Sequence, residues 1–224
     1  MSDIIKLEKV TKTYDRGQRA VNGVSLSIKE KEYVVIYGDA GSGKSTLMRL
    51  IAGLEKPTDG KIVIFDRVVN ELNSEWASAF RNMYFGIMQR TPCFMGNINL
   101  LDNVTLPLAI RGTAPSVRIA AAKKLLETLE LLYAAEAYPS QISGYEAQKA
   151  ALARALITQP KILLLDEAAG NLSIKEAEQL FGILGDFRKS GDYIIVSFSG
   201  TKNSILPADR YFTLDHGSIQ EDIS

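Results

Sequence analysis

The groups best placed to do chemistry lie in one glycine-rich run. Residues 38–46 read GDAGSGKST and fit the pattern G-x-x-x-x-G-K-[ST], with Lys44 and Ser45 in its last positions. Glycines let backbone N–H groups approach an anion closely, and a helix N-terminus adds partial positive charge. The Lys44 ammonium would neutralise phosphate oxygens, and the Ser45 hydroxyl would give one ligand to Mg²⁺. Because a buried strand pattern (YVVIY) precedes the run and a helix pattern (STLMRL) follows it, we predict a phosphate-binding loop here.

An acidic pair follows a second buried strand. Residues 162–167 read ILLLDE, four apolar residues and then Asp166 and Glu167. In open α/β sheets ligands bind at the carboxyl edge of the strands, so both side chains are expected there. Asp166 would hold the water shell of Mg²⁺, and Glu167 would orient or deprotonate an attacking water. The pair is a weak signal alone and a strong one beside a phosphate loop.

The elements that position these groups follow from hydrophobic periodicity. Strand patterns fill residues 1–36 and recur in KIVIFD, KILLLDE, DYIIVSF and YFTLDHGSI. Helical patterns follow the phosphate loop and Ser143, and cover 75–82, 116–133 and 174–190, with Trp76 expected in the core. Residues 89–112 are expected to be loop-rich and broken by Pro92 and Pro107. The buried face of 116–133 is expected to hold Val117, Ala121, Leu125, Leu129 and Leu132. This order predicts a parallel-sheet α/β core with an inserted helical lobe.

Composition excludes several classes of function. The 224 residues carry 26 Lys+Arg and 26 Asp+Glu, and a net charge of zero argues against a nucleic-acid partner. One cysteine and one histidine leave no internal disulfide, cysteine zinc cluster or multi-histidine metal site. His216, in LDHGSI, is expected in a turn between two strands. With no spanning apolar run and no signal peptide, the chain is expected in the cytosol, or at a membrane through partners.

Taken together, these motifs resemble those of the ATP-binding cassette (ABC) subunits of membrane transporters. GDAGSGKS and ILLLDE match the two nucleotide motifs, SGYEAQKAALARALITQPK lies where the signature segment and its helix belong, and the resemblance covers essentially the whole chain. NINLLDNVTLPL and AAGNL are similar to the branch that serves lipoprotein release, macrolide export and cell division. The resemblance implies a P-loop NTPase (RecA-like) core with an antiparallel β subdomain and an inserted α-helical subdomain. Residues 1–224 would form a single ABC ATP-binding domain, with the core in 1–88 and 160–224 and the helical subdomain in 89–159.

The resemblance also implies the roles of individual residues. Glu167 and Gln89 would be catalytic, and Ser45, Gln89 and Asp166 would hold Mg²⁺. The residues implied in ATP binding are Tyr14, which would stack on adenine, and Gly38, Asp39, Ala40, Gly41, Ser42, Gly43, Lys44, Ser45, Thr46, Ser143 and Gly144. Such cassettes act as head-to-tail dimers, so Ser143 and Gly144 would face the ATP held by a second cassette.

The signature segment departs from the family pattern LSGGQ and reads ISGYE over residues 142–146. Tyr145 puts a bulky side chain where backbone should approach phosphate. Glu146 puts a negative charge there, which at ~4 Å and an effective dielectric near 20 costs about 4 kcal/mol. Ser143 and Glu146 also form a capping-box pattern. The segment is therefore either a well-capped helix start that no longer binds phosphate or a weakened working signature.

Four further positions depart from the family. Ala168-Ala169 replaces the usual Pro-Thr after the catalytic glutamate, and Ser173 replaces an aspartate. Phe198 stands where a histidine should contact the γ-phosphate, and phenylalanine donates no hydrogen bond. Ser199, beside it, is the hydroxyl that would substitute in part. We therefore expect an ATPase with impaired, slow hydrolysis.

The expected function is the ATP-binding subunit of an ABC transporter, with ATP and Mg²⁺ as cofactors. It would lie on the cytoplasmic face of the cell membrane and contact the membrane only through a permease. Its second partner would be another cassette, in a homodimer or a heterodimer. For the loop with Phe94, Met95, Leu100 and Leu101, we favour partner contact of the group over core packing. Alternatives are a non-hydrolysing regulatory cassette paired with an intact one, and a soluble ABC protein of DNA repair or translation. The latter usually carries long insertions or tandem cassettes.

Overall fold

Two β-sheets organise the chain, whose computed structural model describes residues 2–191, 193–202 and 205–222. The smaller sheet is antiparallel, with the order β2-β1-β4-β5. Its strands are β1 (Asp3–Thr13), β2 (Arg19–Lys29), β4 (Asp59–Ile64) and β5 (Arg67–Val68). The larger sheet has the order β10-β9-β3-β8-β7-β6. Its strands are β3 (Tyr33–Tyr37), β6 (Phe85–Met88), β7 (Ile162–Asp166), β8 (Ile194–Ser199), β9 (Arg210–Asp215) and β10 (Ser218–Glu221).

The larger sheet is parallel except for β10, and its central strands are buried on both faces. Successive side chains of β3 therefore enter two different cores. Val34 and Ile36 join a cluster with α1 (Lys44–Ile51) and the antiparallel sheet. Tyr33 and Val35 join a second cluster, with apolar residues of the helices between residues 100 and 190. This explains the continuous apolar runs of these strands and confirms the predicted α/β fold.

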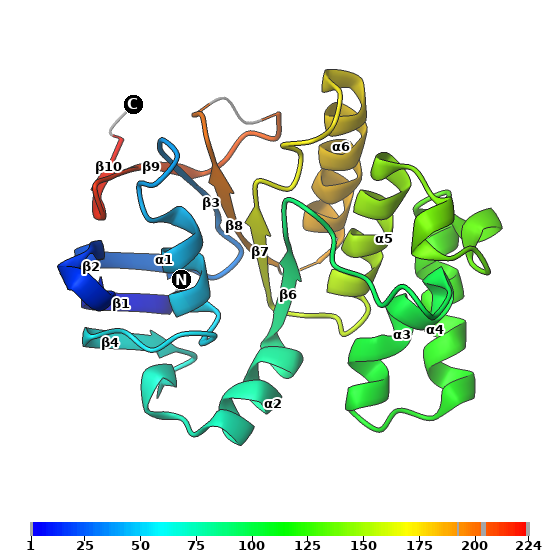
Figure 1. Cartoon of the computed structure of the whole chain (residues 1–224), viewed down its shortest axis with the longest axis horizontal. Coiled ribbons are helices and arrows are strands. Elements are labelled where there is room, and N and C mark those ends of the chain that lie inside the picture. Colours follow the sequence, from blue (N-terminus) through cyan, green and yellow to red (C-terminus); the bar gives the residue numbers. More distant parts are fainter. Residues whose placement is uncertain (1, 192, 203–204, 223–224) are drawn as a thin grey trace.

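The helices surround this sheet (Figure 1). Helix α1 lies between the two sheets, while α3, α4 and α5 group together beyond β6 and β7, next to α6. The helices that follow α1 are α2 (Ser74–Tyr84), α3 (Leu100–Ile110), α4 (Pro115–Thr128), α5 (Gly144–Leu156) and α6 (Ile174–Ser190). In the part of the chain that the structure describes, no helix is long and apolar enough to cross a membrane.

Two expectations about the segment 74–112 are wrong. Trp76 is 64% exposed, and the residue that α2 buries is Phe80. Residues 100–110 form a helix rather than a loop, with Pro107 inside it. The Asn99 side chain caps this helix by accepting from Asp102 N at 2.8 Å. Burial of its apolar face, including Leu100 at 0% exposure, outweighs the one backbone hydrogen bond that a proline removes.

The predicted buried face of residues 116–133 is also only partly right. Helix α4 ends at Thr128, and Leu129 is buried, but Val117 and Leu132 are 58% and 40% exposed. The residues of α4 that are buried are Ala122 and Leu126. The buried face is therefore shifted by about one residue from the predicted face, because α4 packs against α3 and α5.

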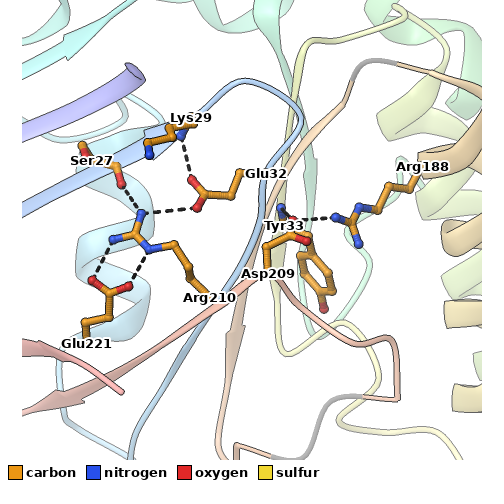
Figure 2. A network of polar contacts seen from close by, with 8 residues as sticks. All are labelled: Ser27, Lys29, Glu32, Tyr33, Arg188, Asp209, Arg210 and Glu221. Atoms are coloured by element: carbon orange, nitrogen blue, oxygen red, sulfur yellow. Dashed lines mark hydrogen bonds and ion pairs between the residues drawn. The ribbon is translucent and has the colours of Figure 1, made fainter. Parts of the chain in front are cut away.

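Arg210 on β9 connects the antiparallel sheet to the larger one (Figure 2). Its guanidinium donates to the Ser27 carbonyl at 2.8 Å and to Glu32 Oε1 at 3.3 Å. It also donates to both carboxylate oxygens of Glu221, at 2.6 and 2.9 Å. These contacts raise the pKa of Arg210, with the Glu221 hydrogen bonds as the largest cause.

Asp209 fixes the start of β3 in the same network (Figure 2). Its Oδ2 accepts from the backbone N–H of Tyr33 at 2.8 Å and from Arg188 Nη2 at 2.5 Å. Both contacts hold β3 at the end opposite the glycine-rich run, which follows Tyr37.

Candidate nucleotide-binding site

The predicted groups emerge at one edge of the larger sheet. Strand register pairs Tyr37 with Ser199 and Asp166 with Phe198, so β3, β7 and β8 end together. Met88 pairs with Leu165, which places the next residue, Gln89, alongside the end of β7. The phosphate loop, the acidic pair and Gln89 therefore share the carboxyl edge, where α/β sheets bind ligands.

The loop between β3 and α1 requires its glycines. Gly41 and Gly43 have φ angles of +83° and +109°, in a region that residues with side chains rarely adopt. A Cβ at Gly38 would lie 2.1 Å from the Leu214 carbonyl oxygen. Gly43 is also the N-cap of α1, so no side chain covers the first N–H groups of that helix. The loop thus presents backbone donors and a helix N-terminus, as an anion site needs.

Lys44 carries a buried charge in the glycine-rich run. Its side chain is 5% exposed, and its ammonium donates to the carbonyl oxygens of Gly38 at 2.6 Å and Asp39 at 2.8 Å. Within residues 2–191, 193–202 and 205–222, no acidic side chain pairs with it. Ser42 Oγ is buried in the same loop and has no hydrogen-bond partner among the described residues. A buried charge and an unsatisfied hydroxyl fit an anion such as a nucleotide phosphate.

Ser45 and Asp166 lie side by side, as the motifs predict. The Ser45 hydroxyl donates to Asp166 Oδ2 at 3.2 Å. Burial raises the pKa of Asp166; the charge of Glu167 raises it further, while the Ser45 hydrogen bond and Lys44 oppose the shift. A hydroxyl and a carboxylate are the hard oxygen ligands that Mg²⁺ takes beside phosphates. In the described part of the chain, no three His, Cys, Asp or Glu residues form a metal cluster.

Glu167 has a partner that the sequence did not indicate. Its φ is +46°, and its backbone N–H donates to the Phe198 carbonyl at 2.9 Å. Its Oε2 lies 3.0 Å from Arg90 Nη1. Arg90 directly follows Gln89, and that adjacency was the signal that could have drawn attention to it.

Tyr14 lies against the first turn of α1. Its hydroxyl donates to Glu55 Oε2 at 2.6 Å and lies 3.4 Å from Thr46 Oγ1. Burial would raise the pKa of Glu55, but hydrogen bonds from Tyr14 and Arg49 produce a net lowering. The structure therefore brings Tyr14 to the phosphate loop and adds Glu55, which the sequence analysis missed, as the group that orients it.

The signature segment forms the predicted capping box. Glu146 N donates to Ser143 Oγ at 3.2 Å, and Ser143 N donates to Glu146 Oε2 at 2.6 Å. The hydroxyl of Tyr133 also donates to Glu146, and this bond is the largest cause of the lowered pKa of Glu146. Tyr145 is half-buried, with its ring centroid 5.1 Å from Lys149 Nζ. Among described contacts, none joins Ser143 or Gly144 to the phosphate loop of the same chain.

Phe198 and Ser173 both have structural roles. Phe198 is fully buried in the cluster around α1, and its side chain presents no polar atom to the sheet edge. Beside it, the Ser199 hydroxyl accepts from Thr201 N at 3.3 Å. Ser173 caps α6, where its backbone N–H donates to Glu176 Oε2 at 2.8 Å.

Comparison with known proteins agrees with this geometry. Residues 21–170 match the model of the ABC transporter family. The lipoprotein-releasing system ATP-binding protein LolD of Psychrobacter arcticus is 31% identical over 221 residues, covering 97% of this chain and 98% of that protein. The macrolide export ATP-binding/permease protein MacB of Chlorobaculum tepidum is 34% identical over 222 residues. That match covers 98% of this chain and 34% of MacB.

A solved structure shows the same fold. The ATP-binding cassette MJ0796, in a dimeric post-hydrolysis state bound to ADP and Pi, superposes with a TM-score of 0.91. It is 31% identical and the match covers 98% of each chain. Given the family match and relatives aligned along nearly their whole length, this chain belongs to the ABC transporter family as one of its ATP-binding cassettes.

Proposed function

We propose that this cassette binds Mg-ATP at a dimer interface, hydrolyses it slowly, and thereby drives or gates a transmembrane permease. The observation that carries the proposal is the buried Lys44 ammonium, which among the described residues donates to two carbonyl oxygens and pairs with no carboxylate, beside the Ser45–Asp166 pair. Charge that is buried without an acidic partner calls for an anion. A hydroxyl–carboxylate pair next to it calls for a hard cation.

Each proposed role belongs to a residue at the sheet edge. Residues 38–46 would bind the phosphates, and Tyr14 would stack on the adenine. Ser45 and Asp166 would hold Mg²⁺, and Gln89 would complete its shell through its amide oxygen. Glu167 would accept a proton from the attacking water. Bound Mg²⁺ would supply positive charge next to the phosphate oxygens.

Slow hydrolysis is proposed because two donors toward phosphate are missing. Phe198 has no hydrogen-bond donor and is buried in the core. Glu146 places a carboxylate at the start of α5, where a second cassette's ATP would lie. Loss of one donor aimed at transition-state charge typically lowers a rate by about 10²–10³-fold. A non-hydrolysing regulatory cassette remains the second candidate, favoured by the engagement of Glu146 in the capping box.

The proposed partners follow from the relatives. LolD is named an ATP-binding protein of a lipoprotein-releasing system, MacB an ATP-binding/permease protein, and MJ0796 forms a dimer. We propose a permease partner, a second cassette, and a position on the cytoplasmic face of the membrane. Met95, which is 50% exposed, supports partner contact for the loop after Gln89. The other three residues of that group do not, because Leu100 and Leu101 are buried and Phe94 packs against the same core cluster. The proposed helical subdomain spans 89–159, between core segments 1–88 and 160–224.

Nucleotide titration tests the core of the proposal. A fluorescent ATP analogue with Mg²⁺ would be titrated onto the wild type, Lys44→Ala and the control Lys61→Ala, which changes an exposed lysine of β4. We expect Lys44→Ala to weaken binding at least tenfold and Lys61→Ala to leave it unchanged. Equal affinity in all three proteins would rule out this phosphate site.

Membrane fractionation tests the transporter assignment. The chain would be expressed with and without a candidate permease from the same genome, and membranes would be separated from the soluble fraction. We expect the chain in the membrane fraction only when the permease is present. If it stays in the soluble fraction in both cases, a soluble ABC protein becomes the better assignment.

A further inference from the structure

Arg90 contacts three segments that meet at the carboxyl edge of the larger sheet. These are Glu167, the segment 168–172, and helix α5. We propose that Arg90 is the positioning residue of Glu167, holding one oxygen of its carboxylate and linking its placement to α5. The inference rests on the proposed function, because it takes Glu167 as the group that accepts a proton from water.

The first contact fixes the carboxylate itself. Arg90 Nη1 lies 3.0 Å from Glu167 Oε2, while the Glu167 backbone N–H is held by the Phe198 carbonyl at 2.9 Å. Arg90 approaches the carboxylate through Oε2, so we take Oε1 as the oxygen that accepts the proton. A general base works only within hydrogen-bond reach of its proton and in the right orientation. A side chain held at both its backbone and one oxygen has few other orientations.

The second contact joins Arg90 to the segment after Glu167. Arg90 Nε donates to Asn171 Oδ1 at 3.4 Å. A Cβ added at Gly170 would lie 3.1 Å from Arg90 Nε and 3.2 Å from the Glu167 carbonyl oxygen. The guanidinium therefore passes directly over Gly170, and a larger residue there would displace it.

The third contact joins Arg90 to α5. Gln148, which is 2% exposed, donates from Nε2 to the Arg90 carbonyl at 2.7 Å. Its Oε1 is buried with no hydrogen-bond partner in the described part of the chain. A movement of α5 would therefore move the backbone that carries the guanidinium.

Stability alone does not account for this arrangement. The Arg90 and Glu167 side chains are 56% and 27% exposed, and ion pairs so accessible to solvent contribute little to folding. An arginine that spans three segments and ends on the proposed base is better explained by orientation of that base.

Hydrogen exchange without nucleotide tests the contact itself. The amides of Gly170 and Leu172 would be followed in the wild type, Arg90→Ala, Arg90→Lys and the control Arg67→Ala, which removes an exposed charge from β5. We expect exchange to rise at least fivefold in Arg90→Ala, less in Arg90→Lys, and not in Arg67→Ala. Unchanged exchange in Arg90→Ala would overturn the proposal. Because no nucleotide is added, this result does not depend on ATP binding. Failure to bind ATP would refute the proposed function but would leave this contact unaffected.

Single-turnover hydrolysis, with the protein in excess over radiolabelled ATP, tests the consequence. We expect Arg90→Ala to lower the rate at least tenfold with ATP affinity within twofold of the wild type. Arg90→Lys should restore part of the rate, and Gly170→Ala should lower it. An unchanged rate, a weakened affinity or a faster rate in Arg90→Ala would each overturn the positioning role.

Discussion

Replacement of Phe198 by histidine sets a stability cost against a gain in rate. Phe198 is 0% exposed and belongs to the cluster around α1. Full burial of a phenylalanine contributes about 1.5–3 kcal/mol, most of which the smaller, polar ring loses. In the nucleotide-free protein, an imidazole N–H left without a partner costs a further ~1–3 kcal/mol. We expect Phe198→His to lower the free energy of unfolding by about 3–5 kcal/mol, within the ~5–15 kcal/mol typical of a domain.

The same change adds a donor near Asp166, with which Phe198 is paired across β7 and β8. A donor in a fully formed site is worth about 10²–10³-fold in rate, and we expect a partial gain of roughly tenfold here. The assay is steady-state phosphate release, with thermal unfolding measured on the same proteins. Phe198→Leu is the matched control, since it disturbs the core without adding a donor. Glu167→Gln should abolish activity. A fast wild-type rate that Phe198→His leaves unchanged would show that Ser199 or another group already has the histidine's role.

Two further predictions concern stability. Ser143→Ala removes the oxygen that accepts from Glu146 N and should destabilise the chain by about 1 kcal/mol in denaturant unfolding, whereas the nearby Ser140→Ala should not. Arg210→Ala should cost about 1–3 kcal/mol, because it removes charged hydrogen bonds to Glu32 and Glu221 and the bond to the Ser27 carbonyl. The Arg210 hydrogen bond lowers the pKa of Glu221 below 4.5, so this part of the stability is present above pH 4.5 and is lost as pH falls through the lowered value. The difference in free energy of unfolding between wild type and Arg210→Ala should therefore be larger at pH 7 than at pH 3.5.

Local patterns were sufficient where neighbouring residues in the sequence decide the structure. The loop at 38–46 needs glycines at defined positions, and the positive φ angles of Gly41 and Gly43 confirm that need. The capping box of Ser143 and Glu146 likewise involves residues only three apart. The residue roles within the nucleotide site remain predictions, because the contacts that define them would be made with ATP.

Tertiary contacts decided the features that the sequence did not predict. Trp76 is a large, mostly apolar residue of the kind that is often buried, yet α2 buries Phe80 instead. Pro107 indicated a broken segment, but burial of Leu100 and Val104 stabilises α3 around it. Arg90 meets Glu167 from 77 positions away in the chain, a contact that depends on β6 pairing with β7. The adjacency to Gln89 could draw attention to Arg90, but not to Glu167 as its partner.

In the proposed dimer, the departures at Phe198 and at Ser143–Glu146 would act on different nucleotides. Phe198 belongs to the sheet edge that carries this chain's own phosphate loop. The start of α5 makes no described contact with that loop, as expected if it serves the ATP of a second cassette. In a homodimer both defects would fall on every nucleotide site, and each would be slow. In a heterodimer they would fall on separate sites, each completed by an intact partner motif, so one defect would remain at each. Subunit composition would therefore set the rate of the complex, and purification with the permease, followed by identification of the second cassette, distinguishes the two cases.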